Sequence, residues 1–190
     1  MVGEGAWQLP SRGKVGMICL IIAESAIFTI FVAAYIFYIG KSLSGPMPRE
    51  ILKVPVIGTT CLLSSSLTMH WAIAALHQGK TSAFRAFWFA TLALGAIFIG
   101  GTAIEWRRLI YEQNFMIQTN LFGTTYYSLV GLHASHVIVG LIGLALVMIL
   151  AVMGKIRQEH SERCEVFSLY WHFVDAVWVV VFATVYIVGR

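Results

Sequence analysis

Long apolar runs alternate with short polar stretches along the 190 residues of this chain. About 20 apolar residues in a helix cross a hydrocarbon core about 30 Å thick, since each residue adds about 1.5 Å. Five runs reach that length and predict an all-α, polytopic membrane protein, a bundle of five transmembrane helices. The predicted spans are residues 16–40, 51–76, 84–106, 124–153 and 166–188. The connections are too short to hold a further domain, so residues 1–190 are expected to form a single membrane domain.

The composition supports this interpretation and excludes other classes. Apolar residues make up 58% of the chain and charged residues 12%, whereas a soluble domain carries about 25% charged residues. A soluble globular enzyme, a disordered chain and a secreted disulfide scaffold are therefore excluded. The net charge of +4 comes mostly from residues between the apolar runs, which indicates loops that flank spans rather than a nucleic-acid surface. Residues 1–14 have no apolar signal-peptide core, so the first span is expected to direct insertion.

Neither the charge distribution nor the short sequence motifs identify a membrane orientation, a catalytic site or a cofactor site. Lys and Arg residues flank the two ends of the predicted spans in nearly equal numbers, so the positive-inside rule does not decide the orientation. No phosphate-binding glycine loop, G-x-S-x-G, H-E-x-x-H or C-x-x-C-H motif occurs. Three cysteines, Cys19, Cys61 and Cys164, form no C-x-x-C pair and are interpreted as small hydrophobes. The functional interpretation therefore depends on ionisable residues inside the spans.

Burying a charge in a bilayer costs about 2.5–3.5 kcal/mol or more, so every ionisable residue within a span needs a reason. Glu24 admits two interpretations, and the sequence leaves both open. It is either a neutral carboxylic acid that is hydrogen-bonded to a neighbouring helix, or a carboxyl group that handles protons or contacts lipid. The other candidates are His70, Glu105, His133, His136, His172 and Asp175.

Two pairs of polar residues occur at a spacing of three. His133 and His136 lie close together on the surface of the fourth predicted helix, and His172 and Asp175 do so on the fifth. The favoured interpretation is that hydrogen bonds join these two helices, with Asp175 selecting one imidazole tautomer. Histidine and carboxylate also suit zinc, iron or copper, so a metal site formed by the four residues is the alternative. His70 is interpreted as a packed or interfacial histidine.

Glu105 ends the third predicted span beside Trp106, Arg107 and Arg108. Aromatic and basic residues at this position are typical of the membrane–water interface, and either arginine offers the carboxylate a cationic partner. We interpret Glu105, Trp106 and Arg107 as an interfacial anchor that is also a candidate for lipid contact.

Five landmarks in the chain resemble one family, subunit III of the haem–copper terminal oxidases of the cytochrome c oxidase type. The last span carries the run YWHFVDAVW at 170–178, and the fourth carries GTTYY at 123–127 followed by GLHASHVIVG at 131–140. The remaining landmarks are Gly16-Met17 followed by Glu24, the run AIEW at 103–106, and His160 with Glu165 before the last span. Their order and separations resemble the family across about residues 14–190, and the chain looks like the five-helix bacterial form.

The resemblance implies a non-catalytic subunit of an oxidase complex in the bacterial cytoplasmic membrane, with the N-terminus inside and the C-terminus outside. Haems and copper belong to subunits I and II, so no cofactor or metal is expected in this chain. Expected partners are subunit I by direct contact, subunit II, a small subunit IV and membrane lipids, with bound phospholipid. Glu24 matches a buried glutamate associated with proton uptake and carbodiimide labelling. His160 and Glu165 match a loop near the cytoplasmic lipid region.

Two other functions remain as alternatives. One is a subunit III-like protein that accompanies a nitric oxide reductase. The other belongs to a different class, a stand-alone membrane metalloprotein that uses His133, His136, His172 and Asp175 as ligands. The metalloprotein requires these side chains to converge on one point, at about 2.0–2.2 Å from the metal. The interhelical interpretation requires them to form ordinary hydrogen bonds of about 2.7–3.2 Å.

Overall fold

The computed structural model describes residues 11–42, 45–46 and 48–189, and this part of the chain is helical with no strand. Residues 1–10, 43–44, 47 and 190 of the predicted domain lie outside the described residues. The helices are α1 (Arg12–Tyr38), α2 (Pro48–Ile51), α3 (Val56–His77), α4 (Thr81–Tyr111), α5 (Leu121–Val152), the 3-10 helix η1 (Gln158–His160), α6 (Ser161–Phe182) and the π-helical η2 (Ala183–Val188). Five of the described helices are long and apolar enough to cross a membrane, which confirms the predicted all-α fold.

Each predicted span falls on one of these helices, but the boundaries differ. The second span was predicted to begin at residue 51, and this is wrong because α3 begins only at Val56. Pro55 immediately precedes it, and a proline disfavours helical backbone at the residue before it. Residues Pro48–Ile51 form the separate short helix α2 instead. The third span is longer than predicted, since α4 continues to Tyr111 beyond the apolar run.

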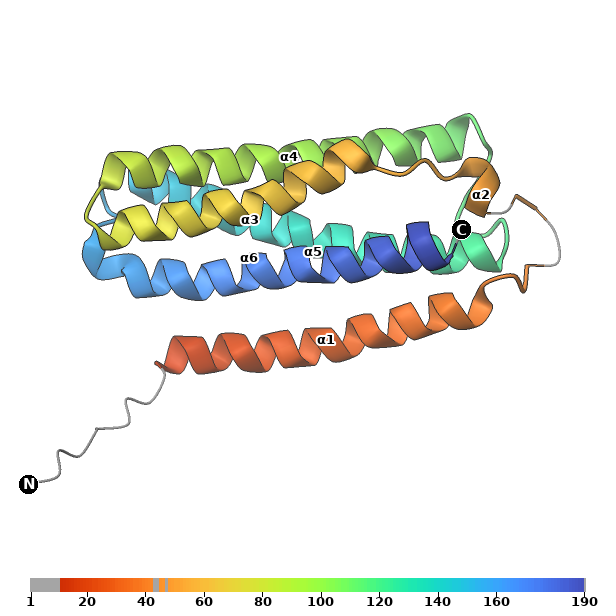
Figure 1. The fold of residues 1–190 in the computed structure, drawn as a ribbon, viewed down its shortest axis with the longest axis horizontal. Coiled ribbons are helices and arrows are strands. Elements are labelled where there is room, and N and C mark those ends of the chain that lie inside the picture. The colour runs from red at the N-terminus through yellow and green to blue at the C-terminus, as the bar shows by residue number, and fades with distance from the viewer. Residues whose placement is uncertain (1–10, 43–44, 47, 190) are drawn as a thin grey trace, which may run out of the picture.

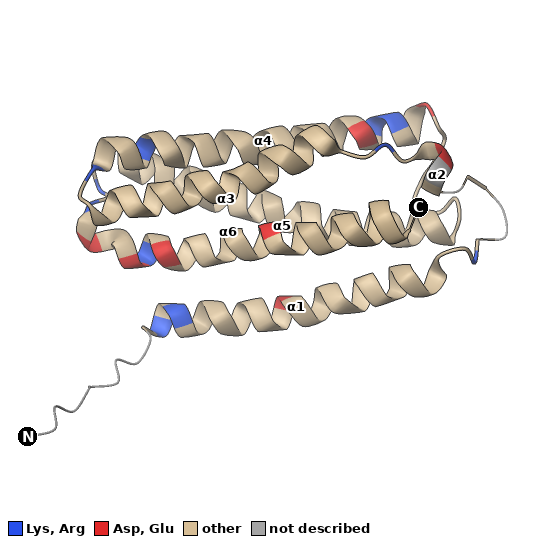
Figure 2. Ribbon diagram, viewed as in Figure 1, with Lys and Arg blue, Asp and Glu red and all other residues tan. Residues whose placement is uncertain are grey.

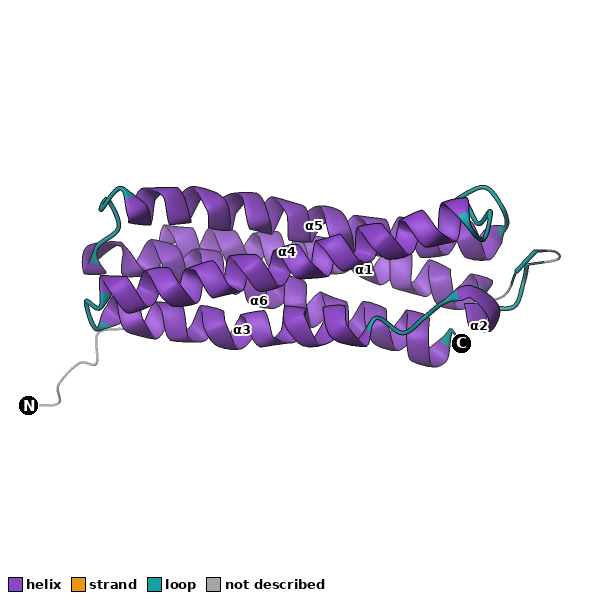
Figure 3. Ribbon diagram, turned by 90° about the horizontal axis from the view of Figure 1, so that it is seen from above, coloured by secondary structure: helices purple, strands orange, loops and turns teal. Residues whose placement is uncertain are grey.

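The five long helices run up and down as a bundle (Figure 1). α3 and α4 form a closely packed antiparallel hairpin, and α1 packs on α5 and α6 rather than on its sequence neighbour α3. Figure 3 shows the same bundle from above, with the connections confined to its two ends. Lys, Arg, Asp and Glu also gather at these ends and are sparse in between (Figure 2). This distribution is the one that a bilayer around the middle of the helices requires.

Three tryptophans fill the centre of the bundle and satisfy their indole N–H groups inside it. Trp88 of α4 donates to the carbonyl oxygen of Leu144 at 3.0 Å. Trp171 of α6 donates to Oγ of Ser65 at 2.8 Å. Trp178 donates to Oγ1 of Thr59 at 3.2 Å. All three rings are buried. Because the indole N–H needs a partner in an apolar interior, the bonds of Trp171 and Trp178 orient α6 against α3, and the bond of Trp88 orients α4 against α5.

Two glycines leave the space that the Trp171 ring occupies. A Cβ atom at Gly95 of α4 would lie 2.8 Å from the Trp171 ring and 2.9 Å from the Leu141 side chain. A Cβ atom at Gly140 of α5 would also lie 2.8 Å from the same ring. Helices approach closely where small residues meet, so these positions allow α4 and α5 to close around α6.

Gly95→Ala is expected to destabilise the bundle by about 1–3 kcal/mol, because the added methyl group overpacks a ring that its hydrogen bond holds in place. Thermal unfolding in lipid–detergent micelles measures this loss. Gly100→Ala on the same helix is the matched control, because a Cβ atom there meets nothing within 4 Å. Equal midpoints for the two variants would contradict the close packing described above.

Candidate polar sites between the helices

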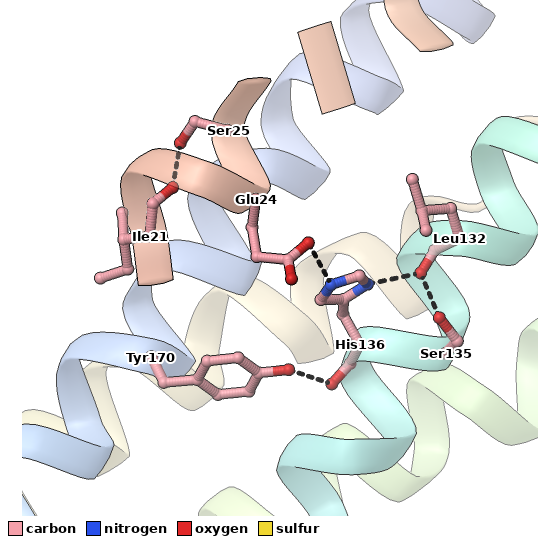
Figure 4. Close-up of polar contacts among 7 residues, drawn as sticks. All are labelled: Ile21, Glu24, Ser25, Leu132, Ser135, His136 and Tyr170. Carbon is pink, nitrogen blue, oxygen red and sulfur yellow. Dashed lines mark hydrogen bonds and ion pairs between the residues drawn. The ribbon is translucent and has the colours of Figure 1, made fainter. Parts of the chain in front are cut away.

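The carboxyl group of Glu24, near the middle of α1, contacts a histidine of another helix. Its Oε2 lies 3.1 Å from Nε2 of His136 on α5, and the two side chains point toward one another (Figure 4). The other ring nitrogen of His136, Nδ1, lies 2.8 Å from the carbonyl oxygen of Leu132. A carbonyl oxygen only accepts hydrogen bonds, so Nδ1 carries a proton and donates it.

This tautomer decides how Glu24 and His136 can pair. With Nδ1 protonated, a neutral His136 accepts at Nε2, and Glu24 must then donate as a carboxylic acid. A neutral pair places no charge among the helices, which favours it over a carboxylate beside an imidazolium. Tyr170 of α6 donates to the backbone carbonyl of His136 at 3.1 Å, so α1, α5 and α6 meet at this histidine (Figure 4).

His133 faces the aromatic interior instead. Its ring lies 5.0 Å from that of Trp178, 5.8 Å from Phe98 and 6.4 Å from Phe28, measured between centroids. The side chain is fully buried, and neither ring nitrogen has a hydrogen-bond partner among the described residues. His133 and His136 thus have different surroundings although they are only three residues apart.

His172 and Asp175 of α6 meet on a serine of α3. Nδ1 of His172 lies 3.0 Å from Oγ of Ser66, and Oδ2 of Asp175 is hydrogen-bonded to the same hydroxyl group. Sequence reasoning missed Ser66. The run Ser64–Ser66 within an apolar span was the available signal, since serines join helices inside membranes.

The predicted contacts between the fourth and fifth transmembrane helices therefore need correction. His136 pairs with α1, whereas His172 and Asp175 pair with α3, and no hydrogen bond between the two predicted pairs occurs among the described residues. The four side chains also do not converge. Within the described ranges, no three His, Cys, Asp or Glu side chains lie close enough to hold a metal ion, so the arrangement that the metalloprotein alternative needs is absent there.

Glu105 pairs with a cation, as its neighbourhood in the sequence predicts, and the partner is Arg108 rather than Arg107. Arg108 also donates to the carbonyl oxygen of Ile51 at 2.7 Å, so the pair ties the end of α4 to α2. Trp106 packs on Tyr127 with ring centroids 5.2 Å apart, while Arg107 is exposed. Three neighbouring residues thus have three different surroundings.

Glu165 joins three helices at the opposite end of the bundle. Its Oε2 lies 2.9 Å from Nζ of Lys14 on α1, and its Oε1 contacts Nε2 of His77 on α3. His160 accepts a hydrogen bond from the backbone N–H of Arg157 at 3.3 Å and does not join this cluster. His70 is exposed on α3.

Comparison with known proteins places this arrangement in a family. Residues 3–190 match the family described as Cytochrome c oxidase subunit III. The chain is 31% identical to a cytochrome c oxidase subunit 3 of Thermostichus vulcanus, with 98% of this chain and 92% of the relative aligned. It is 34% identical to a probable cytochrome c oxidase subunit 3 of Nocardia farcinica (94% and 89% aligned). It is 31% identical to a cytochrome bo(3) ubiquinol oxidase subunit 3 of Pseudomonas aeruginosa (89% and 81% aligned).

The fold and its polar contacts define a class: a multi-pass helical membrane protein whose intramembrane polar groups join its own helices. The match over nearly the whole length shows the family. The chain belongs to the cytochrome c oxidase subunit III family and is an accessory subunit III of a haem–copper oxidase, a complex of electron transport. The resemblance seen in the sequence is confirmed, and neither alternative function is favoured.

Glu24 is expected to react with a hydrophobic carbodiimide, because such reagents enter the membrane and activate protonated carboxyl groups. Mass spectrometry of labelled peptides measures the product. Glu24→Gln should lose the label on the peptide that carries residue 24, whereas Glu105→Gln should keep the label on that peptide, since Glu105 is paired with an arginine. Absence of label on that peptide in the wild-type protein would contradict a protonated carboxyl group at this position.

Glu165→Gln is expected to loosen α1, because it removes the ion pair with Lys14 and weakens the contact with His77. Partly exposed pairs contribute about 0.2–1 kcal/mol each, so the loss should be of that order and should shrink as salt screens the wild-type contacts. Thermal unfolding at low and high ionic strength measures it. Glu112→Gln, at an exposed glutamate at the end of α4, serves as the control. A salt-independent loss would point to packing rather than to charge.

Proposed function

We propose that this chain is the non-redox subunit III of a bacterial oxidase of the cytochrome c oxidase type, and that it packs mainly on the haem-bearing subunit I. Subunit II and a small subunit IV are its further partners, and haems and copper lie in the partner subunits. The observation that carries this proposal is the family match from residue 3 to residue 190 on a chain of five membrane-spanning helices. In this role the chain stabilises the complex and supports proton uptake without an active site of its own.

The outer faces of the bundle support a role in assembly. Large apolar side chains remain exposed on every long helix, among them Ile30 on α1, Ile57 on α3, Ile104 on α4, Val139 on α5 and Val180 on α6. Side chains of this kind are stable only against lipid or another apolar protein surface. The outer surface is therefore suited to lipid contact on one side and to a large membrane partner on another.

An apolar groove between α1 and α6 offers a place for lipid. It has a volume of about 300 Å³, and its lining includes Phe28, Val32, Phe173, Val177 and Val180. The lining is almost entirely hydrocarbon, so it suits an acyl chain rather than a polar ligand. We assign the phospholipid expected for this subunit to this groove, next to the turn of α1 that carries Glu24.

In the proposed orientation, the start of α1 lies on the cytoplasmic side of the bacterial inner membrane. The contact of Lys14 with Glu165 then lies at the cytoplasmic surface, and Glu105, Trp106 and Arg107 lie at the outer interface. Glu24 is half-buried between these levels and pairs with His136. This placement suits a carboxyl group that holds a proton within the membrane.

Purification through a tag on this chain in mild detergent tests the proposal. The expected result is co-purification of a large haem-bearing subunit in about one-to-one ratio, with haem a bands in the reduced-minus-oxidised spectrum and with O₂ consumption. Haem b or o bands with ubiquinol-driven O₂ consumption would assign the chain to a quinol oxidase, the type of oxidase named for its Pseudomonas relative.

Two results would overturn the proposal. Haems b and c together with consumption of nitric oxide would assign the chain to a reductase. A colourless chain that is alone in chemically crosslinked native membranes would exclude an oxidase subunit, because crosslinking before extraction prevents loss of a weakly held partner. Partner mass spectrometry on the crosslinked sample decides between these outcomes.

A further inference from the structure

The hydroxyl group of Ser66 lies between two side chains of α6. It is 3.0 Å from Nδ1 of His172 and hydrogen-bonded to Oδ2 of Asp175. Asp175 is only 3% exposed, whereas Ser66 and His172 are partly exposed. Hydrogen bonds thus connect the buried Asp175 through Ser66 to the partly exposed His172.

The hydrogen-bond partners of Asp175 indicate its protonation state. Its second oxygen, Oδ1, is buried and has no hydrogen-bond partner among the described residues. In a carboxylate this oxygen would carry half of a buried, unsolvated charge, and no cation is paired with Asp175 within the described ranges. In a carboxylic acid it is only a carbonyl oxygen, whose burial costs far less. The geometry therefore favours the acid, with its proton on Oδ2 directed at Ser66.

One protonation pattern then satisfies all three groups. Asp175 donates to Oγ of Ser66, and Ser66, which has a single proton, donates onward to Nδ1 of His172. His172 must accept at Nδ1, so a neutral ring carries its proton on Nε2. Both donors then point in the same direction, from the buried Asp175 toward the partly exposed His172.

We propose that Asp175, Ser66 and His172 form a proton-binding relay between α3 and α6, in which Asp175 holds an exchangeable proton that passes through the Ser66 hydroxyl to His172. In the transfer, the O–H bond of Asp175 breaks and its proton binds Oγ of Ser66. The O–H bond of Ser66 breaks at the same time, and that proton binds Nδ1 of His172. The products are a carboxylate and an imidazolium, no electrons leave or enter, and the reverse transfer restores the acid.

The elements around the relay contribute few other titratable groups. On α3, His70 lies one turn beyond Ser66 and is exposed. On α5, His133 packs on Trp178, and on α1, Glu24 is already paired with His136. α4 contributes Thr91, a neutral residue that bonds to Thr68 of α3 at 2.7 Å. The relay is therefore separate from the Glu24 pair and does not depend on the function proposed above.

The sequence itself makes a single-site measurement possible, because Asp175 is the only aspartate among the 190 residues. Cell-free synthesis with aspartate carrying ¹³C in the side-chain carboxyl group, followed by reconstitution in phospholipid vesicles, gives a full chain in which the label reports on Asp175 alone. Infrared difference spectra between labelled and unlabelled protein then show whether the band that shifts belongs to a carboxylic acid or to a carboxylate. This measurement needs no variant, so it does not depend on how well a variant folds.

The expected result at neutral pH is an isotope shift in the carboxylic-acid region. In Ser66→Ala that band should move to higher wavenumber, because the acid loses its acceptor, and exchange of its proton in D₂O should slow severalfold. Thr68→Ala is the matched control, since it removes a hydroxyl from the same helix outside the relay and should change neither quantity. Nitrogen NMR of ¹⁵N-histidine protein, assigned with His172→Gln, should show an unprotonated Nδ1 at His172.

Three results would overturn the proposal. An isotope shift confined to the carboxylate region would show that Asp175 is ionised. A protonated Nδ1 at His172 with a neutral ring would reverse the direction of the second hydrogen bond. An acid band and an exchange rate that Ser66→Ala and Thr68→Ala leave equally unchanged would show that Ser66 carries no proton between the two groups.

Discussion

A polar group inside a bilayer has to find its partner within the protein, and the structure of this bundle depends on that constraint. Helices satisfy the backbone, and several intramembrane side chains form hydrogen bonds to side chains of other helices. Glu24 on α1 meets His136 on α5, and Asp175 on α6 meets Ser66 on α3. Each such contact favours one rotation of a helix and one neighbour for it. Apolar packing alone specifies the neighbour poorly, because lipid is as apolar as a helix surface.

The same constraint explains the centre of the bundle. Trp171 combines a ring that needs space with an N–H group that needs an acceptor. Gly95 and Gly140 leave the space, and Ser65 accepts the hydrogen bond. Residues from α3, α4 and α5 thus converge on one side chain of α6, and this makes α6 the helix around which the others are arranged. The proton relay that we propose uses His172 and Asp175, which lie next to Trp171 on the same helix.

α1 is attached differently from the other long helices. It contacts α5 and α6 but forms no hairpin with α3, and its polar contacts occur at two levels, Lys14 with Glu165 near one end and Glu24 with His136 near the middle. An apolar groove lies beside the second level. α1 therefore has fewer long helices as neighbours within the bundle than the helices it contacts, and an apolar groove separates part of it from α6.

The sequence alone determined the fold class, the number of spans and the family, because a bilayer imposes length and polarity on each span separately. It also identified the ionisable residues within the spans, since the cost of burying a charge is evident without a structure. It did not identify the buried hydroxyl groups of Ser65, Thr91, Ser168 and Thr184. It also did not determine the partners of the ionisable residues. The side chains of His133 and His136 leave the axis of α5 in directions about 60° apart. As a result, the ring of His133 packs on Trp178 and the ring of His136 contacts Glu24. Which neighbour a side chain meets depends on how each helix is rotated within the bundle, and only the tertiary structure decides this, because the rotation is set by contacts between residues far apart in the chain.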